Sequence, residues 1–145
     1  MPEPESRMPT VKEVYVALRT ASGGTRDLDI MIAELIGWQR RTLKITDTAT
    51  GRVKERPQWM PPESDSPSKV PQYTTDMDDS YFLARESANG SRIAFSWEKG
   101  SASAVVGSTS HISEAPTLSL ALCVASVLKI ATDQASSEKT MDLSA

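Results

Sequence analysis

The most constraining feature of the sequence is the apolar stretch from Glu114 to Asp133, EAPTLSLALCVASVLKIATD. Apolar side chains recur in it at the spacing of one helix face, as at Leu118, Ala121, Leu122 and Ala125. Further apolar residues cover most of the remaining circumference, so only a narrow polar stripe is left. Because such a helix needs cover on several sides, the stretch predicts a central core helix packed against a sheet and other helices.

Length, charge and cysteine content limit the classes of protein to which this chain can belong. A chain of 145 residues fits one domain with a sizeable core. With 16 basic and 19 acidic residues the net charge is −3, so we expect no sequence-specific nucleic-acid binding. The single cysteine, Cys123, excludes an internal disulfide framework, and its apolar neighbours predict a buried, inert thiol.

The sequence also carries no signal for export or membrane insertion that we recognise. The N-terminal MPEPESRMPT lacks the apolar region and cleavage site of a secretory signal. Ser126 and Lys129 interrupt the longest hydrophobic run, which we expect to be too short to span a bilayer. We therefore expect a soluble protein of the cytoplasm with no membrane partner.

The N-terminal part of the chain predicts two helices after a disordered tail at residues 1–9. The first helix opens with a capping box formed by Thr10 and Glu13. The second is capped by Thr25 or Asp27, and a Ser-Gly-Gly link between the two favours an αα-hairpin.

A β-hairpin and a proline-rich segment follow. Residues 41–46 and 52–56 flank a five-residue loop at 47–51 and predict a hairpin that is half-buried at best. Residues 57–71 contain five prolines, which argue against a helix or a central strand. We expect this segment to be an extended crossing loop.

The second half predicts a third helix and a second hairpin before the core helix. Thr74 or Thr75 would cap the third helix, with an inner face of Met77, Tyr81, Ala84 and Ala88. Residues 92–98 and 101–106 alternate between larger apolar and small or polar side chains, as half-buried strands do.

The predicted element order is therefore ααββαββα. We expect a single domain at residues 10–133, followed by a frayed polar tail at residues 134–145. The fold class is α+β: a layered α/β/α sandwich in which helices cover antiparallel hairpins.

Two stretches resemble a known family. VPQYTTDMDDSYFLA at residues 70–84 resembles the P-x-Y-T/S helix start of the phage ABA-sandwich domain family. The stretch at residues 114–130 resembles that family's closing helix, with its Ala-Leu-Cys-x-Ala pattern. RDLDIMIAELIGW at 26–38 and WMPP at 59–62 match in the same order. The resemblance implies a three-layer sandwich encoded by a bacteriophage or prophage, and it brings no catalytic residues with it.

The residues able to do chemistry form no recognisable catalytic or metal site. His111 is the only histidine, so a Ser–His or Cys–His nucleophile system would need it, yet no nucleophile-elbow motif accompanies it. Asp76, Asp78 and Asp79 lack the glycine and distal glutamate of a calcium loop and suit a helix N-terminus. We expect no enzyme, no cofactor and no metal.

The sequence feature that points to a binding site is the basic character of the first predicted hairpin. Guanidinium groups beside indoles suit phosphates and stacked bases. The plainer interpretation is a solvated hairpin whose cations protect its edges and whose tryptophans pack into the core. The candidate ligand-binding residues are Trp38, Arg40, Arg41, Lys44, Arg56 and Trp59.

Three functions remain open at this point. The favoured one is a non-enzymatic phage accessory protein that acts in the host cytoplasm by binding a host protein. The alternative is binding or sequestration of a small anionic, nucleotide-type ligand, such as a host-defence signal, through the basic hairpin. The third is an enzyme served by His111. The sequence is compatible with a monomer or a homodimer.

Overall fold

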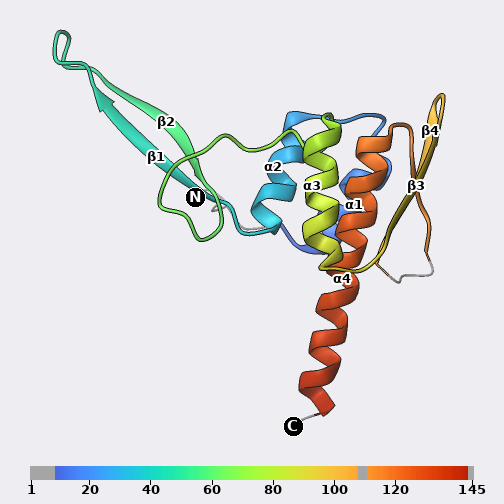
Figure 1. The fold of residues 1–145 in the computed structure, drawn as a ribbon. Coiled ribbons are helices and arrows are strands. Elements are labelled where there is room, and N and C mark those ends of the chain that lie inside the picture. Colours follow the sequence, from blue (N-terminus) through green and yellow to red (C-terminus); the bar gives the residue numbers. More distant parts are fainter. Residues whose placement is uncertain (1–8, 108–110, 144–145) are drawn as a thin grey trace.

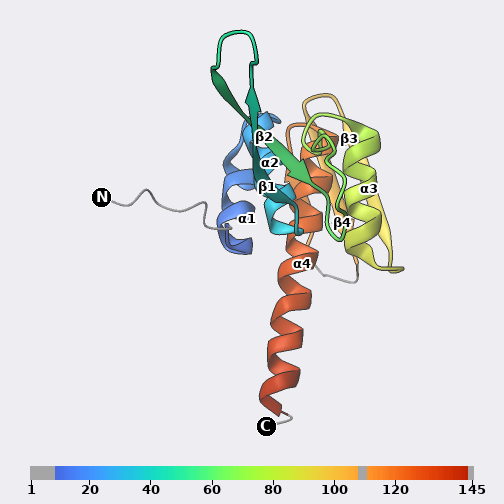
Figure 2. The same ribbon diagram turned by 90° about the vertical axis from the view of Figure 1, so that its left-hand side faces the viewer.

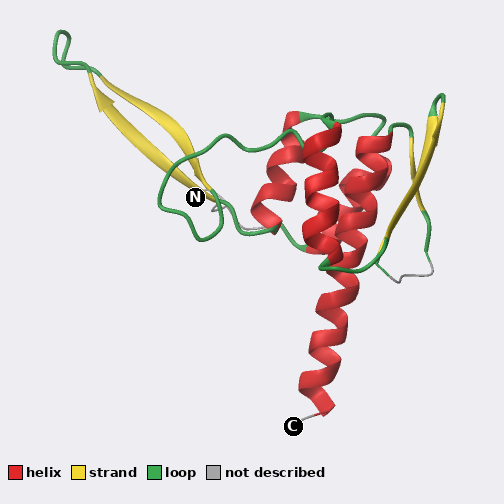
Figure 3. Cartoon of the chain, viewed as in Figure 1, coloured by secondary structure: helices red, strands yellow, loops and turns green. Residues whose placement is uncertain are grey.

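The fold places four helices between a projecting hairpin and a three-stranded sheet (Figures 1 and 3). The computed structural model describes residues 9–107 and 111–143, so most of the expected N-terminal tail lies outside the described residues. The helices are α1 (Val11–Thr20), α2 (Arg26–Leu35), α3 (Met77–Ala88) and α4 (Leu118–Leu143). The strands are β1 (Gln39–Thr46), β2 (Val53–Met60), β3 (Ile93–Glu98), β4 (Ser101–Val106) and β5 (Ser113–Ala115).

The first part of α4 is the centre of the core, as predicted. Every residue from Ser119 to Val127 is buried, and α1, α3 and the three-stranded sheet all contact this helix. The helix then continues to Leu143, where Figure 2 shows it extending well past the other helices. The expected frayed tail is thus wrong for residues 134–143, because the chain stays helical there.

By length and composition α4 could also cross a membrane, so the expectation that its apolar run is too short to span a bilayer is wrong. The stretch from Leu118 to Ser137 has a mean hydropathy of 1.4, and half of its most apolar window is buried inside the protein. Since the core helix of a soluble protein meets the same criterion, this is weak support for a membrane span.

Helix capping follows the sequence at two of the three helix starts for which a capping residue was predicted. The Thr10 and Thr25 hydroxyls accept hydrogen bonds from the backbone N–H groups of Glu13 and Leu28, as predicted. The third helix is capped by Asp76 instead of Thr74 or Thr75. Thr74 is unavailable for capping because its side chain is engaged with α2.

The inner face of α3 differs in part from the prediction. Ala84 and Ala88 are buried, and Ser80 and Leu83 join them. Met77 and Tyr81, expected inside, are exposed. Since α4 contacts α3 far more extensively than β3 does, only the face of α3 toward α4 is fully covered.

The three-stranded sheet has the order β3-β4-β5, with all pairs antiparallel. The helices lie on one side of it (Figure 1). Ala102, Ala104 and Val106 face α4 and are buried, and their cross-strand partners Trp97, Phe95 and Ile93 share that face. Phe95 and Trp97 are nevertheless exposed because β3 is the edge strand. β5 is a short strand that the predicted element order does not contain. The α+β class and its antiparallel hairpins are confirmed.

The first hairpin is longer and more exposed than predicted. β1 and β2 pair from Gln39–Met60 to Thr46–Val53, and most of their residues are exposed. Residues 57–60, expected to begin an extended crossing loop, belong to β2 instead, although they do not form a central strand. Pro57 lies opposite Thr42 in a hairpin with no third strand, where the missing N–H of proline is tolerated. We call residues 39–60 the arm and the rest of the described chain the body.

Candidate functional site: the basic arm

The arm projects away from the body as a two-stranded ribbon (Figures 1 and 2). Each strand has eight residues, which corresponds to a length of about 27 Å. A loop closes the far end, where the Asp47 carboxylate accepts a hydrogen bond of 2.9 Å from the Ala49 backbone N–H. That bond and the Thr50 hydroxyl lower the pKa of Asp47. The tip is therefore an ordered turn with its own hydrogen bonds.

The strand register divides the predicted ligand-binding residues between two faces of the arm. Residues directly opposite each other in an antiparallel pair share a face, and successive residues alternate. Arg41 and Arg56 share face A, whose other members are Gln39, Leu43, Ile45, Lys54, Gln58 and Met60. Arg40, Lys44 and Trp59 lie on face B with Thr42, Thr46, Val53, Glu55 and Pro57. The six predicted residues therefore do not converge on one site.

Trp38 belongs to the body and not to the arm. Its side chain is only 8% exposed and forms a hydrogen bond with Tyr73, which itself lies in the core. Trp59 is half-buried at the base of β2 and packs against the core cluster. The two indoles therefore do not flank the basic side chains as a pair, and the positions of both rings agree with the plainer interpretation, in which the tryptophans pack into the core.

Charge is strongly segregated between arm and body. The arm carries six basic and two acidic residues, a net charge of +4, so the rest of the chain carries −7. Face A holds three cations, Arg41, Lys54 and Arg56, whose cross-strand partners are Gln58, Ile45 and Leu43. On face B, by contrast, Lys44 lies directly opposite Glu55. Face A is therefore cationic and aliphatic, whereas face B is largely neutralised.

A buried polar cluster, which sequence analysis did not predict, joins the loop before α3 to α2. Asp29 is only 1% exposed, and its Oδ1 accepts hydrogen bonds from the backbone N–H (2.8 Å) and the hydroxyl (2.6 Å) of Thr74. Arg26 donates to the other carboxylate oxygen over 3.1 Å and to the carbonyl oxygens of Val70 and Pro71. Every oxygen of the carboxylate is thus engaged within the protein.

Two further contacts tighten the same junction. A Cβ at Gly24 would lie 2.2 Å from the carbonyl oxygen of Thr74, so only glycine permits this approach. The Cys123 thiol donates to the carbonyl oxygen of Tyr73 over 3.0 Å. The cluster thus connects the two sequence stretches that carry the Arg-Asp-Leu-Asp and Tyr-Thr-Thr patterns. Its satisfied hydrogen bonds point to a structural role.

The residues best suited to nucleophilic chemistry are not assembled. Cys123 is fully buried in α4, as predicted, and burial raises the pKa of its thiol far above the ordinary value. A thiol in that state is a poor nucleophile at neutral pH. His111 is exposed before β5, and the neighbouring Ser108, Thr109 and Ser110 lie outside the described residues. Within the described residues, no group of three or more potential ligands could hold a metal ion.

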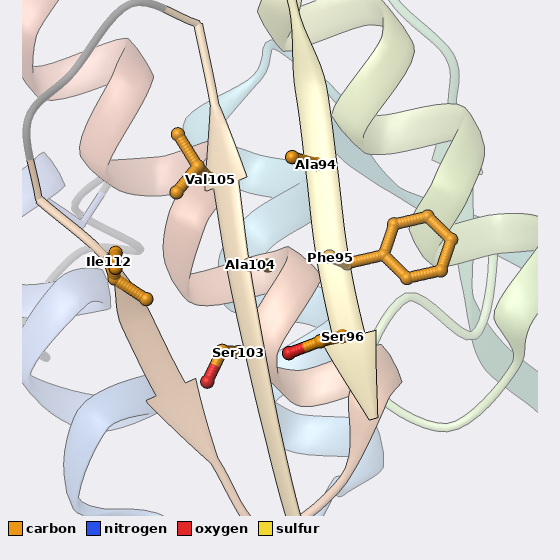
Figure 4. A pocket seen from close by; sticks show the side chains of 7 residues that line it. All are labelled: Ala94, Phe95, Ser96, Ser103, Ala104, Val105 and Ile112. Carbon is orange, nitrogen blue, oxygen red and sulfur yellow. The ribbon is translucent and has the colours of Figure 1, made fainter. Parts of the chain in front are cut away.

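The outer face of the three-stranded sheet has a shallow depression of about 250 Å³ (Figure 4). Its lining consists of Phe95 and of small or aliphatic residues, among them Ser103, Val105 and Ile112. The lining contains no titratable side chain, so this depression offers no acid or base for catalysis.

Comparison with known proteins gives no relative. A scan against protein-family models found no matching family, and searches of curated proteins and of solved structures found no similar protein. The resemblance to the phage ABA-sandwich domain family stays a prediction.

Proposed function

We propose that this chain is a non-enzymatic binding protein, encoded by a bacteriophage or prophage, whose arm binds a host protein. The proposal rests on the arm, which is a ribbon with a net charge of +4 that projects from a body of opposite charge. A long, exposed hairpin contributes little to a core, whereas it can reach into or along a partner surface.

Face A is the contact surface in this proposal. Protein interfaces favour arginine and apolar side chains together, and face A alternates Leu43 and Ile45 with three cations. Leu43 and Ile45 are among the exposed large hydrophobic residues of the chain. The matching partner surface is an acidic groove or ridge with apolar patches, and long-range attraction would speed the encounter.

Reversing charge on one face at a time tests this proposal. A tagged Arg41→Glu/Arg56→Glu variant should lose the bacterial protein that the wild-type chain retains from lysate, with at least tenfold weaker binding. The matched control, Arg40→Glu/Lys44→Glu, makes the same change in net charge on face B and should retain it. Equal loss in both variants would contradict the assignment to face A, and retention in both would contradict a role for arm charge.

The second candidate is a small anionic, nucleotide-type ligand, as considered from the sequence. One observation favours it: Arg41 and Arg56 are diagonal neighbours on face A, so the two residues lie about 7–8 Å apart, with a somewhat shorter distance between their Cβ atoms. A phosphate between two guanidinium groups could bind there. Native mass spectrometry before and after denaturation distinguishes the two candidates. A released nucleotide would favour this reading, and a co-purified polypeptide would favour the first.

A further inference from the structure

The outer edge of β3 offers a row of unpaired backbone groups. In the sheet order β3-β4-β5, no described strand pairs with that edge. The hydrogen bond from the Gly107 N–H to the Arg92 carbonyl oxygen shows that Arg92 turns its backbone toward β4. In an antiparallel strand, the backbone N–H and C=O groups of successive residues point to alternate sides. The residues next in the alternation, Ile93, Phe95 and Trp97, therefore turn these groups outward, away from β4.

Apart from the charge of Glu98 at its end, this edge lacks the devices that keep strand edges from pairing. Its sequence, IAFSWE, contains no lysine or proline, and its pairing with β4 continues over six residues without a bulge. Phe95 is 49% and Trp97 is 70% exposed on it. Figure 4 shows the Phe95 side chain pointing beyond the edge of the sheet, away from Val105 and Ile112. An edge of this kind is a template for another strand.

We propose that the strand that covers this edge is β3 of a second copy of the chain. Two antiparallel β3 strands related by a two-fold axis at Phe95 place Ile93 opposite Trp97, and Arg92 opposite Glu98 at both ends. This register matches the outward-facing residues of one copy with those of the other, as the hydrogen-bond pattern requires. The result is a continuous six-stranded sheet.

Charge complementarity selects a second copy over an unrelated peptide. Arg92 and Glu98 flank the strand with opposite charges, so an inverted copy presents the opposite charge at each end. The helices of each copy lie on one side of its sheet (Figure 1), and no described strand occupies the outer edge of β3.

A charge-swap series tests the dimer and its register together. The single variants Arg92→Glu and Glu98→Arg each place like charges opposite one another at both ends, and each should raise the dimer dissociation constant by about tenfold or more. The double variant should restore the dissociation constant of the wild-type dimer. Within one copy the two positions are about 20 Å apart along the strand, so rescue reports contact between copies. Sedimentation velocity on the full-length chain measures the constant.

A cysteine pair provides an independent test. Phe95→Cys should give a covalent dimer on mild oxidation, because residues paired across the two-fold axis have Cα atoms about 5.5 Å apart. Ser96→Cys is the matched control and should crosslink at least tenfold more slowly, since Ser96 would face Ala94 of the other copy. Cys123 is buried and should not interfere. A monomeric wild-type chain, a dimer insensitive to the charge series, or equal crosslinking at both positions would overturn the proposal.

Discussion

The arm and the body differ in what surrounds their side chains. In the body, α4 is buried on all sides from Ser119 to Val127, and even the polar Asp29 and Thr74 have partners in the interior. In the arm, nearly every residue is in contact with solvent, and it meets the core only at its base, through Trp59 and Met60. The body is organised by burial, whereas the arm is organised by strand pairing alone.

This difference implies a division of labour between stability and binding. An isolated two-stranded hairpin is marginally stable in water, so the arm depends on the body that holds its base. The proline-rich segment helps here, because the Ser68 N–H donates to the Trp59 carbonyl oxygen over 2.9 Å. Substitutions in the body should therefore change unfolding, and substitutions on the arm should change binding.

The largest expected effect is the loss of the Asp29 carboxylate. Asp29→Ala leaves the buried Thr74 backbone N–H without an acceptor and removes one of the two acceptors of the Thr74 hydroxyl, as well as the carboxylate partner of Arg26. Because hydrogen bonds to a charged group contribute about 1.5–3 kcal/mol each, the change should cost about 3–5 kcal/mol of unfolding free energy. Urea denaturation followed by circular dichroism measures this cost. Asp27→Ala, an exposed change in the same helical turn, is the control and should cost less than about 1 kcal/mol. Similar values for both would contradict a structural role for the buried cluster.

A smaller loss should follow from closing the space at Gly24. Gly24→Ala pushes a methyl group against the Thr74 carbonyl and should cost about 1–3 kcal/mol. Gly23→Ala meets no atom within 4 Å and should change the unfolding free energy by less than about 1 kcal/mol. The comparison of the two neighbours in urea isolates the close approach from general effects of alanine. If Gly23→Ala proved the more damaging change, the packing at this junction would be misassigned.

Alkaline pH should weaken the body through Tyr73. Burial raises the pKa of its hydroxyl to about 12, above the ordinary value of 10.0. The folded state therefore holds this proton more tightly, so the stabilisation is complete below pH 10 and is lost as pH rises toward 12. The loss should be about 1.4 kcal/mol per pH unit in that window. Tyr73→Phe should lose less stability over the same window, and identical slopes would contradict the assignment.

The smallest expected effect is on the arm. Ile45→Thr, at a solvent-facing position of β1, should change the unfolding free energy by no more than about 0.5 kcal/mol. Because Ile45 lies on face A, the same change should weaken binding of the partner protein. A large loss of stability with unchanged binding would reverse the proposed division between arm and body.

The fold could be predicted from the sequence where one physical signal dominates. The apolar stretch predicted the core helix, and the hydroxyls of Thr10 and Thr25 predicted two helix starts. The signals were misleading where tertiary contacts compete with local ones. Thr74 resembles a helix cap, but its hydroxyl is drawn to Asp29, so α3 begins at Met77. Nothing in local spacing indicates an interaction between residues 45 positions apart.

The candidate site could be predicted only as a concentration of charge. Composition shows that six cations lie in residues 39–60, but the division into faces depends on a register fixed by pairs such as Leu43–Arg56. The plainer interpretation places Trp38 in the core, as the structure confirms, but nothing local in the sequence identifies Tyr73 as its partner there. The part that sequence analysis missed is therefore geometric.

Shortening the arm tests the separation of binding from stability most directly. Since Arg41 pairs with Gln58, residues 42–57 can be replaced by Asn-Gly, which joins the remaining strands through a two-residue turn. We would measure retention of the bacterial partner from lysate and urea unfolding on the same preparation. We predict that retention of the bacterial partner is lost while the unfolding free energy changes by less than about 1 kcal/mol. A variant that still retains the partner, or whose body no longer folds, would contradict it.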